Sequence, residues 1–137
     1  MPIASLTEWN QFLQQHPNAH LLQSGEWGEL KSAFGWKPVR IINADAGVQI
    51  LFRKLPLGFS VGYIPKAVTT GPSSVVGDRI RSEIEDVCRK HRAVFVKLEP
   101  DAWQDDFNIS VSTFILSRHN IQPPRTIIVD ISSGEEE

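Results

Sequence analysis

The stretch Leu21–Pro38, LLQSGEWGELKSAFGWKP, is the segment around which the rest of the chain can be organised. Ser24 is typical of a helix start, because a serine hydroxyl accepts a hydrogen bond from a backbone N–H in the first turn. Three apolar residues follow at the i, i+3, i+7 spacing of one helix face, namely Trp27, Leu30 and Phe34. Gly35 suits a left-handed C-terminal cap and Pro38 forbids further helix, so the stretch predicts a short helix that leads into a strand.

Lys31 comes four residues after Trp27 and is therefore expected on or beside the same apolar face. An aromatic helix with one cation at its border, next to a strand, is suited to holding an anionic ligand. The structural alternative is a lysine whose stem covers apolar helix surface while its ammonium stays in water.

The composition is that of one ordinary globular domain of 137 residues. The formal net charge of −2 gives no electrostatic case for nucleic acid as the main partner, although a local basic patch is compatible with it. The single cysteine, Cys88, excludes an internal disulfide framework and is expected to be buried and inert. No apolar run approaches the ~18 residues of a spanning helix, and the N-terminus lacks a signal-peptide pattern, so we expect a cytoplasmic protein.

Another helix is expected before the opening stretch, and the period of the pattern changes after it. Ser5–Glu8 fits a capping box, and the helix behind it is expected to stop before Pro17. After the second helix, alternation with period two predicts three strands, at Pro38–Asn43, Val48–Arg53 and Phe59–Ile64. Because the connections between them are short, we expect an antiparallel meander. The segment from Pro65 to Gly77 is expected to be an irregular loop.

The clearest helix is Gly77–His91, followed by the apolar run Ala93–Leu98. A strand, a crossover helix and another strand form a β-α-β unit, so the last strand should run parallel to the one before the helix. Its continuous apolar character predicts burial on both faces at the centre of the sheet. Residues 110–118 are ambiguous between strand and helix, and residues 126–131 predict a last strand. The fold class is therefore α/β with a mixed sheet.

The sequence lacks the motifs of a metal site and of a coenzyme A site. The four histidines, His16, His20, His91 and His119, are scattered, so no metal site is expected. The order helix, helix, three strands, helix, strand is that of the N-acetyltransferase fold, which holds coenzyme A on backbone amides of a glycine-rich turn. The corresponding segment, Tyr63–Gly77, lacks a G-x-G cluster. We therefore expect no coenzyme A site there and no cofactor.

Four segments together resemble the Fem family of peptidyltransferases, in the family's order: LLQSGEWGELKSAFGWKP, GYIPKA, KLEPD and NIQPPRTIIVDIS. Members of that family extend the peptide of peptidoglycan precursors with amino acids taken from aminoacyl-tRNA. They contain two acetyltransferase-like domains, and the resemblance implies that residues 1–137 are one such domain, the N-terminal part of a longer protein. A strand followed by acidic residues at the end of the chain, where a helix would begin, agrees with this. One departure is that Ala67 and Val68 stand where the family often has Gly-Pro.

The resemblance also implies site residues. Lys31 corresponds to a basic residue that helps bind the acceptor, a nucleotide- or lipid-linked muramyl peptide that carries a diphosphate. Tyr63 and Lys66 are expected near the same ligand, and Trp36 as core or pocket wall. Four carboxylates follow the apolar strand, Glu99, Asp101, Asp105 and Asp106, but their exposed-looking segment favours a loop. We assign no catalytic residue.

The sequence thus favours the first domain of an aminoacyltransferase of peptidoglycan synthesis, with aminoacyl-tRNA as donor. Two alternatives stay open at this point. One is a stand-alone N-acetyltransferase that uses acetyl coenzyme A, which the missing glycine turn argues against. The other is a non-catalytic binding or interaction domain that kept the fold.

Overall fold

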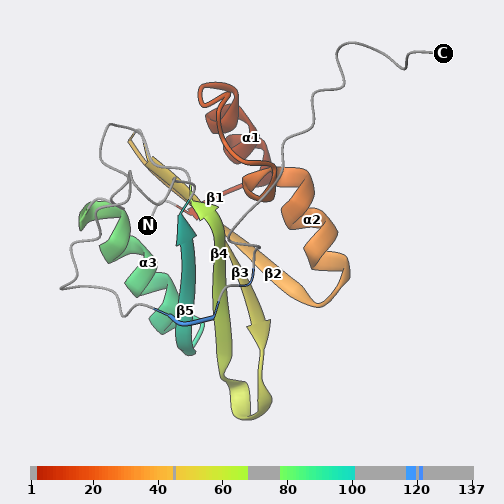
Figure 1. Cartoon of the computed structure of the whole chain (residues 1–137), viewed down its shortest axis with the longest axis vertical. Coiled ribbons are helices and arrows are strands. Elements are labelled where there is room, and N and C mark those ends of the chain that lie inside the picture. The colour runs from red at the N-terminus through yellow and green to blue at the C-terminus, as the bar shows by residue number, and fades with distance from the viewer. Residues whose placement is uncertain (1–2, 45, 68–77, 101–116, 120, 122–137) are drawn as a thin grey trace.

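The computed structural model describes residues 3–44, 46–67, 78–100, 117–119 and 121 (Figure 1). In this part of the chain, three α-helices and a mixed sheet of five strands form an α/β fold. The strands lie in the order β1-β2-β3-β4-β5, so each is next to its neighbour in sequence. The expected fold class is confirmed.

The first helix begins where the sequence predicted. α1 spans Leu6–Gln14, and Ser5 caps it: the Ser5 hydroxyl accepts from the Glu8 backbone N–H at 3.3 Å, while the Glu8 carboxylate accepts from the Ser5 backbone N–H at 2.7 Å. This reciprocal pair satisfies two N–H groups that have no partner within the helix. The sequence did not predict the short strand before it, β1 (Ile3–Ala4), which pairs antiparallel with β2.

The opening stretch also folds as expected at both ends. A 3₁₀ turn, η1 (Leu21–Gln23), leads into α2 (Gly25–Ala33), whose first turn is capped by the Ser24 hydroxyl. Gly35 follows the helix with φ +86°, a backbone conformation that side chains with a Cβ rarely adopt. The helix therefore ends at the predicted glycine.

Three antiparallel strands form the predicted meander. They are β2 (Trp36–Asn43), β3 (Ala46–Lys54) and β4 (Ser60–Ala67), and the 3₁₀ turn η2 (Pro56–Gly58) connects the last two. The pairing is Arg40 with Gln49 between β2 and β3, and Leu51 with Tyr63 between β3 and β4. β4 continues through Ala67, three residues beyond its predicted end, and the rest of the expected loop lies outside the described residues.

The β-α-β unit is confirmed. α3 (Asp78–Lys90) connects β4 to β5 (Ala93–Pro100), and β5 runs parallel to β4. α3 packs on one face of the sheet in a continuous apolar cluster: Val39, Ile41, Val48, Ile50, Phe52, Ile64, Ile80, Ile84 and Val87. Cys88 is half-buried beside this cluster. Burial and, to a lesser extent, the Glu85 charge raise the pKa of its thiol to about 11, so the thiol is protonated at neutral pH. The sequence predicted a buried cysteine, and the burial is only partial.

One expectation about β5 is wrong for the described part of the sheet. β5 pairs with β4 on one side only and is the last strand of the order, not a central one. Val94 and Phe95 near its start are 62% and 58% exposed, whereas Val96 and Leu98 pack against the α3 cluster. The continuous apolar run thus predicted the strand correctly but did not predict its position in the described sheet. Residues 110–116 and the predicted strand at 126–131 lie outside the described residues.

Candidate functional site

The face of the sheet opposite α3 carries α1 and α2. In β3, Val48, Ile50 and Phe52 belong to the α3 cluster, so the alternating residues between them point to the other face. Gln49 is one of these, and its side-chain amide donates to the backbone oxygen of Ser24, directly before α2, at 2.9 Å. In Figure 1, α3 and the pair α1 and α2 lie on different sides of the strands. The candidate site lies on the α2 face.

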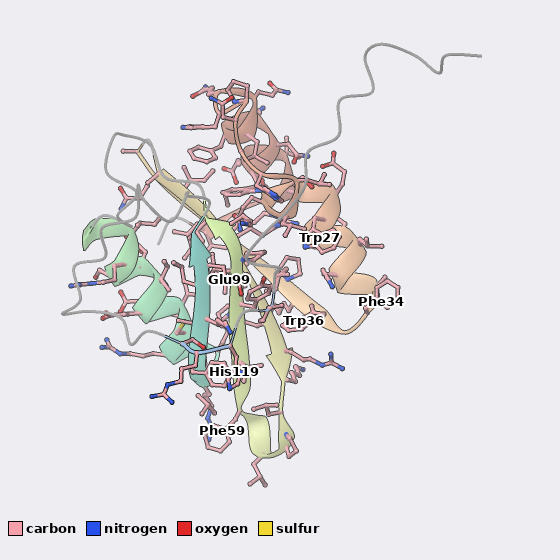
Figure 2. The ribbon with its side chains drawn as sticks, viewed as in Figure 1. Trp27, Phe34, Trp36, Phe59, Glu99 and His119 are labelled. Carbon is pink, nitrogen blue, oxygen red and sulfur yellow. The ribbon has the colours of Figure 1, made fainter. Side chains whose placement is uncertain are left out.

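The α2 helix approaches the sheet at Gly28 and approaches α1 at Gly25. Gly25 and Gly28 are its buried residues, whereas Leu30 and Phe34 are 50% and 68% exposed. A Cβ added at Gly28 would lie 2.3 Å from the Gln49 side-chain oxygen, a separation that real Cβ atoms do not show. A larger residue at this position would force the Gln49 and Arg40 side chains to move from their present positions. Two of the three residues that the sequence marked as an apolar face, Leu30 and Phe34, are exposed, and Figure 2 shows Phe34 beyond the end of α2 at the edge of the molecule.

Between α2 and the sheet lies a polar seam, formed by Gln23, Ser24, Glu29, Arg40 and Gln49. Gln23, Arg40 and Gln49 are buried, Ser24 is half-buried and Glu29 is exposed. Arg40 is buried, and its Nε donates to the Gln49 side-chain oxygen at 2.9 Å. Its Nη2 donates to the Glu29 carboxylate, also at 2.9 Å. The seam fixes α2 on the sheet by hydrogen bonds that require both partners to keep their positions.

Gln23 completes the seam and is fully buried. Its side-chain oxygen accepts from the Gln49 backbone N–H at 2.8 Å, and its amide nitrogen donates to the backbone oxygens of Gln49 and Pro65. The β3–β4 pairing ends at Leu51 and Tyr63, two residues before Gln49 would meet Pro65. Proline has no N–H and cannot continue the ladder of hydrogen bonds between the strands. The Gln23 side-chain amide therefore bonds the backbone N–H and oxygen of Gln49 and the backbone oxygen of Pro65 in place of that ladder.

Lys31 lies where the sequence placed it. Its Nζ is 4.9 Å from the centre of the Trp27 ring, so the ammonium packs over the aromatic face. Both side chains are half-buried. A cation that is held by a ring and keeps contact with solvent can bind an anionic group such as a phosphate.

A second ring and cation lie at the start of β2. Trp36 is half-buried, and the Arg53 guanidinium carbon is 5.6 Å from its ring centre. Trp36 is four residues from Arg40 along the strand and therefore points to the same face, toward α2. Figure 2 shows Trp27 and Trp36 on neighbouring elements, α2 and β2.

Tyr63 belongs to a third group, on β4 and β5. Its hydroxyl donates to the Glu99 carboxylate at 3.0 Å. The other oxygen of Glu99 accepts from the Ile121 backbone N–H at 2.7 Å, and the Lys97 ammonium donates to the Ser117 hydroxyl and the His119 backbone oxygen. Two charged residues of β5 thus hold residues 117–119 and 121 beside the strand.

The four predicted ligand residues are only partly brought together. Lys31, Trp36 and Tyr63 lie on the α2 side of the sheet, each with its own partner: Trp27, Arg53 and Glu99. Lys66 comes directly after Pro65 with φ +49°, at an irregularity in the β4–β5 pairing, so strand alternation does not place its side chain on that face.

Sequence reasoning missed the polar seam and misjudged Glu99. Glu99 is part of β5 and bonds Tyr63, whereas the sequence favoured an exposed loop; Asp101, Asp105 and Asp106 lie outside the described residues. One available signal for the seam was Pro65, because a proline inside a paired strand leaves a backbone partner without a donor. A buried glutamine that lies nearby in space can supply the missing hydrogen-bond donor.

Two features are absent from the residues that the structure describes. No three or more His, Cys, Asp or Glu side chains among them are grouped so that they could hold a metal ion. None of the helices in this part of the chain is long and apolar enough to cross a membrane.

Comparison with known proteins gives relatives of stated function. The chain is 30% identical to a "Lipid II:glycine glycyltransferase" of Staphylococcus haemolyticus (strain JCSC1435), over 95% of this chain and 36% of that protein. It is 28% identical to the protein of the same name from Staphylococcus aureus, over 95% of this chain and 35% of that protein. The chain thus spans about a third of the length of these curated relatives. No solved structure matches it significantly.

The family model named FemAB matches residues 4–129, nearly all of the chain. The match includes the capped helices, the polar seam, the meander and the β-α-β unit, and it agrees with the resemblance read from the four motifs. The mixed sheet is that of the acetyltransferase-like fold of this family. The chain belongs to the FemAB family.

Proposed function

We propose that the chain is the first, acetyltransferase-like domain of an aminoacyltransferase that adds amino acids to the peptide of a peptidoglycan precursor. The observation that carries the proposal is the family match over residues 4–129, together with relatives named for glycyl transfer to lipid II. Because the chain spans about a third of those relatives, we assign the complete reaction to a longer, two-domain protein.

The acceptor in this proposal is a muramyl peptide linked to a lipid or a nucleotide, and the donor is aminoacyl-tRNA. An amine of the acceptor peptide attacks the carbonyl carbon of the aminoacyl ester, an amide bond forms, the ester C–O bond breaks, and the tRNA hydroxyl leaves. This chemistry requires alignment of two large substrates and stabilisation of an oxyanion, without a cofactor.

In this reaction, Lys31 has the role of an acceptor contact. Its ammonium, held over Trp27 at 4.9 Å, would meet the diphosphate of the precursor. Gly28 and the polar seam position the Lys31 ammonium, because they set the distance of α2 from the sheet. Trp36 and Tyr63, on the same side of the sheet, are secondary candidates for contact with the acceptor.

The two alternatives have less support. A stand-alone acetyltransferase would need backbone amides for a coenzyme A pyrophosphate, and the sequence after Tyr63 lacks the glycine cluster that usually presents them. A non-catalytic domain of the same fold would bind the acceptor without any transfer by the full-length protein.

The test is a transfer assay with the full-length protein. Purified enzyme, lipid II in detergent and a pool of radiolabelled aminoacyl-tRNAs should give a precursor heavier by one amino acid residue. The 137-residue chain alone should bind the acceptor and transfer nothing. Failure of the full-length protein to modify lipid II or its nucleotide-linked counterpart would overturn the proposal, and acetylation from acetyl coenzyme A would favour the first alternative.

A further inference from the structure

We propose that the tip of the β3–β4 hairpin is a membrane-surface anchor that places apolar side chains among the lipids of an anionic bilayer. The hairpin tip is defined here by three apolar residues, Leu55, Leu57 and Phe59, and three cations, Arg53, Lys54 and Arg92. Figure 1 shows this hairpin at one end of the long axis of the molecule, opposite α1. The inference goes beyond the proposed function, because it requires no transfer chemistry.

The apolar residues of the tip are exposed to different degrees. Leu57 is 86% exposed, whereas Leu55 and Phe59 are each 39% exposed. Leu57 also has φ +65° and ψ +22°, the left-handed region that disfavours a residue with a Cβ. The turn thus presents a leucine side chain to the surroundings, in a backbone conformation that glycine would adopt without strain.

One of the three cations contacts an apolar side chain of the tip, and the other two precede the turn in sequence. The Arg92 guanidinium carbon is 4.6 Å from the centre of the Phe59 ring. The Arg92 backbone oxygen accepts from the Ser60 N–H at 3.1 Å, which attaches the turn after α3 to the hairpin. Arg53 and Lys54 are exposed at the end of β3, immediately before the turn.

The charge of this end of the molecule differs from that of the whole chain. The chain carries a formal net charge of −2, yet residues 53–60 and 87–95 contain no Asp or Glu. A further cation, Lys37, is close enough to His91 at the end of α3 for its charge to help lower the pKa of that histidine. The two segments are therefore net positive, although Arg89 in the second is ion-paired with Glu85 and Asp86 of α3.

An anionic bilayer complements both properties of the tip. Apolar side chains gain free energy when they leave water for the boundary between headgroups and acyl chains, and adjacent cations are attracted to acidic headgroups. A projecting turn with cations near its base can place its apolar side chains in this boundary without unfolding. The anionic bilayer is therefore the partner of the hairpin tip. Self-association through the same residues is the competing outcome of the test.

The first experiment is flotation of the 137-residue chain with vesicles of phosphatidylcholine, with or without phosphatidylglycerol, both lacking any peptidoglycan precursor. We expect binding to the anionic vesicles that weakens in high salt. Leu57→Gly should lower the partition coefficient roughly tenfold, because it removes most of the inserted apolar surface. Lys54→Gln should lower it about fivefold.

The matched control is Leu21→Ala, which truncates another leucine that is 70% exposed but lies before α2, away from the hairpin. It should leave vesicle binding unchanged. Leu57→Gly also relieves the left-handed backbone strain, so its melting temperature should not fall. A loss of binding in that variant therefore cannot be attributed to unfolding.

A second measurement locates the inserted residue. An environment-sensitive maleimide dye on Leu57→Cys should shift its emission to the blue with anionic vesicles, and the same dye on Leu21→Cys should not. The natural Cys88 stays unlabelled near neutral pH because the pKa of its thiol is about 11. No binding to anionic vesicles, full binding by Leu57→Gly, or a dimer that Leu57→Gly dissociates would each overturn the proposal. A failed transfer assay would not affect it.

Discussion

The two faces of the sheet are built on different physical principles. Toward α3, nine buried apolar residues pack against one another without a buried ion pair among the described residues. Toward α2, Gln23, Arg40 and Gln49 are buried and joined by hydrogen bonds. An apolar face depends on volume and tolerates similar shapes, whereas a polar seam depends on the chemical identity of each member. The two faces should therefore respond differently to substitutions that conserve size.

The largest effect is expected for Gln23→Leu, which conserves size and removes the amide. The Gln49 backbone N–H and the backbone oxygens of Gln49 and Pro65 would lose their Gln23 partner in a buried place. Each unsatisfied group costs about 1–3 kcal/mol, so we expect a loss of roughly 3 kcal/mol or more in the free energy of unfolding, measured by urea denaturation.

Gln11→Leu is the matched control for this change, because Gln11 is an exposed residue of α1. It should change the free energy of unfolding by less than about 0.5 kcal/mol. If both glutamine variants lost the same small amount of unfolding free energy, the hydrogen bonds of the polar seam would not be what holds β3, β4 and α2 together.

A smaller effect is expected on the other face, for Ile50→Val. Ile50 is fully buried in the α3 cluster, and the change removes one methylene group while it keeps the β-branched shape. The free energy of unfolding should fall by about 0.5–1.5 kcal/mol, again by urea denaturation. A loss larger than that of Gln23→Leu would contradict the proposed difference between the two faces.

The smallest effect concerns the edge of the apolar face, where His91 stacks on Phe52 with ring centres 4.3 Å apart. Burial, and then the Lys37 charge, lower the pKa of His91 below its ordinary value of 6.5. The unfolded chain therefore binds a proton more readily than the folded one. Stability should be unaffected by this group above pH 6.5 and should fall as the pH drops from 6.5 through the lowered folded value.

His91→Phe keeps an aromatic ring against Phe52 and removes the titrating group. Urea midpoints of the wild type and this variant, measured from pH 7.5 to 5, should therefore diverge in their pH dependence, with the steeper acid loss in the wild type. The other histidines are present in both proteins and cancel in the difference. Parallel pH profiles would show that the environment of His91 does not disfavour its charge.

The same contrast explains what the sequence could predict. Periodicity found the apolar face, because Ile80, Ile84 and Val87 repeat at helical spacing and Val48, Ile50 and Phe52 alternate. Local chemistry found the helix ends, as the Ser5 capping box and the left-handed Gly35 demonstrate. These features depend on residues close in sequence.

The polar seam depends on residues far apart in sequence and has no period. Gln23 meets Gln49 and Pro65, which are 26 and 42 positions away, so no local pattern marks it. The outward direction of Leu30 and Phe34 was missed for a related reason, because Gly28 marks the side of α2 that approaches the sheet and Gly25 marks the side that approaches α1. Among the predicted ligand residues, Lys31 was placed correctly beside Trp27, and its role in binding stays a prediction.

The central claim is that α2, fixed on the sheet by the polar seam, presents Lys31 to an anionic acceptor. The direct test is acceptor binding by the full-length protein and its Lys31→Ala and Lys31→Arg variants, with the melting temperature of each. We expect Lys31→Ala to weaken acceptor affinity about ten- to a hundredfold, the equivalent of a charge-assisted contact of about 1.5–3 kcal/mol, with an unchanged melting temperature. Lys31→Arg should restore part of the affinity. Unchanged affinity with a lowered melting temperature would contradict the claim, and would identify Lys31 as a side chain that only covers Trp27.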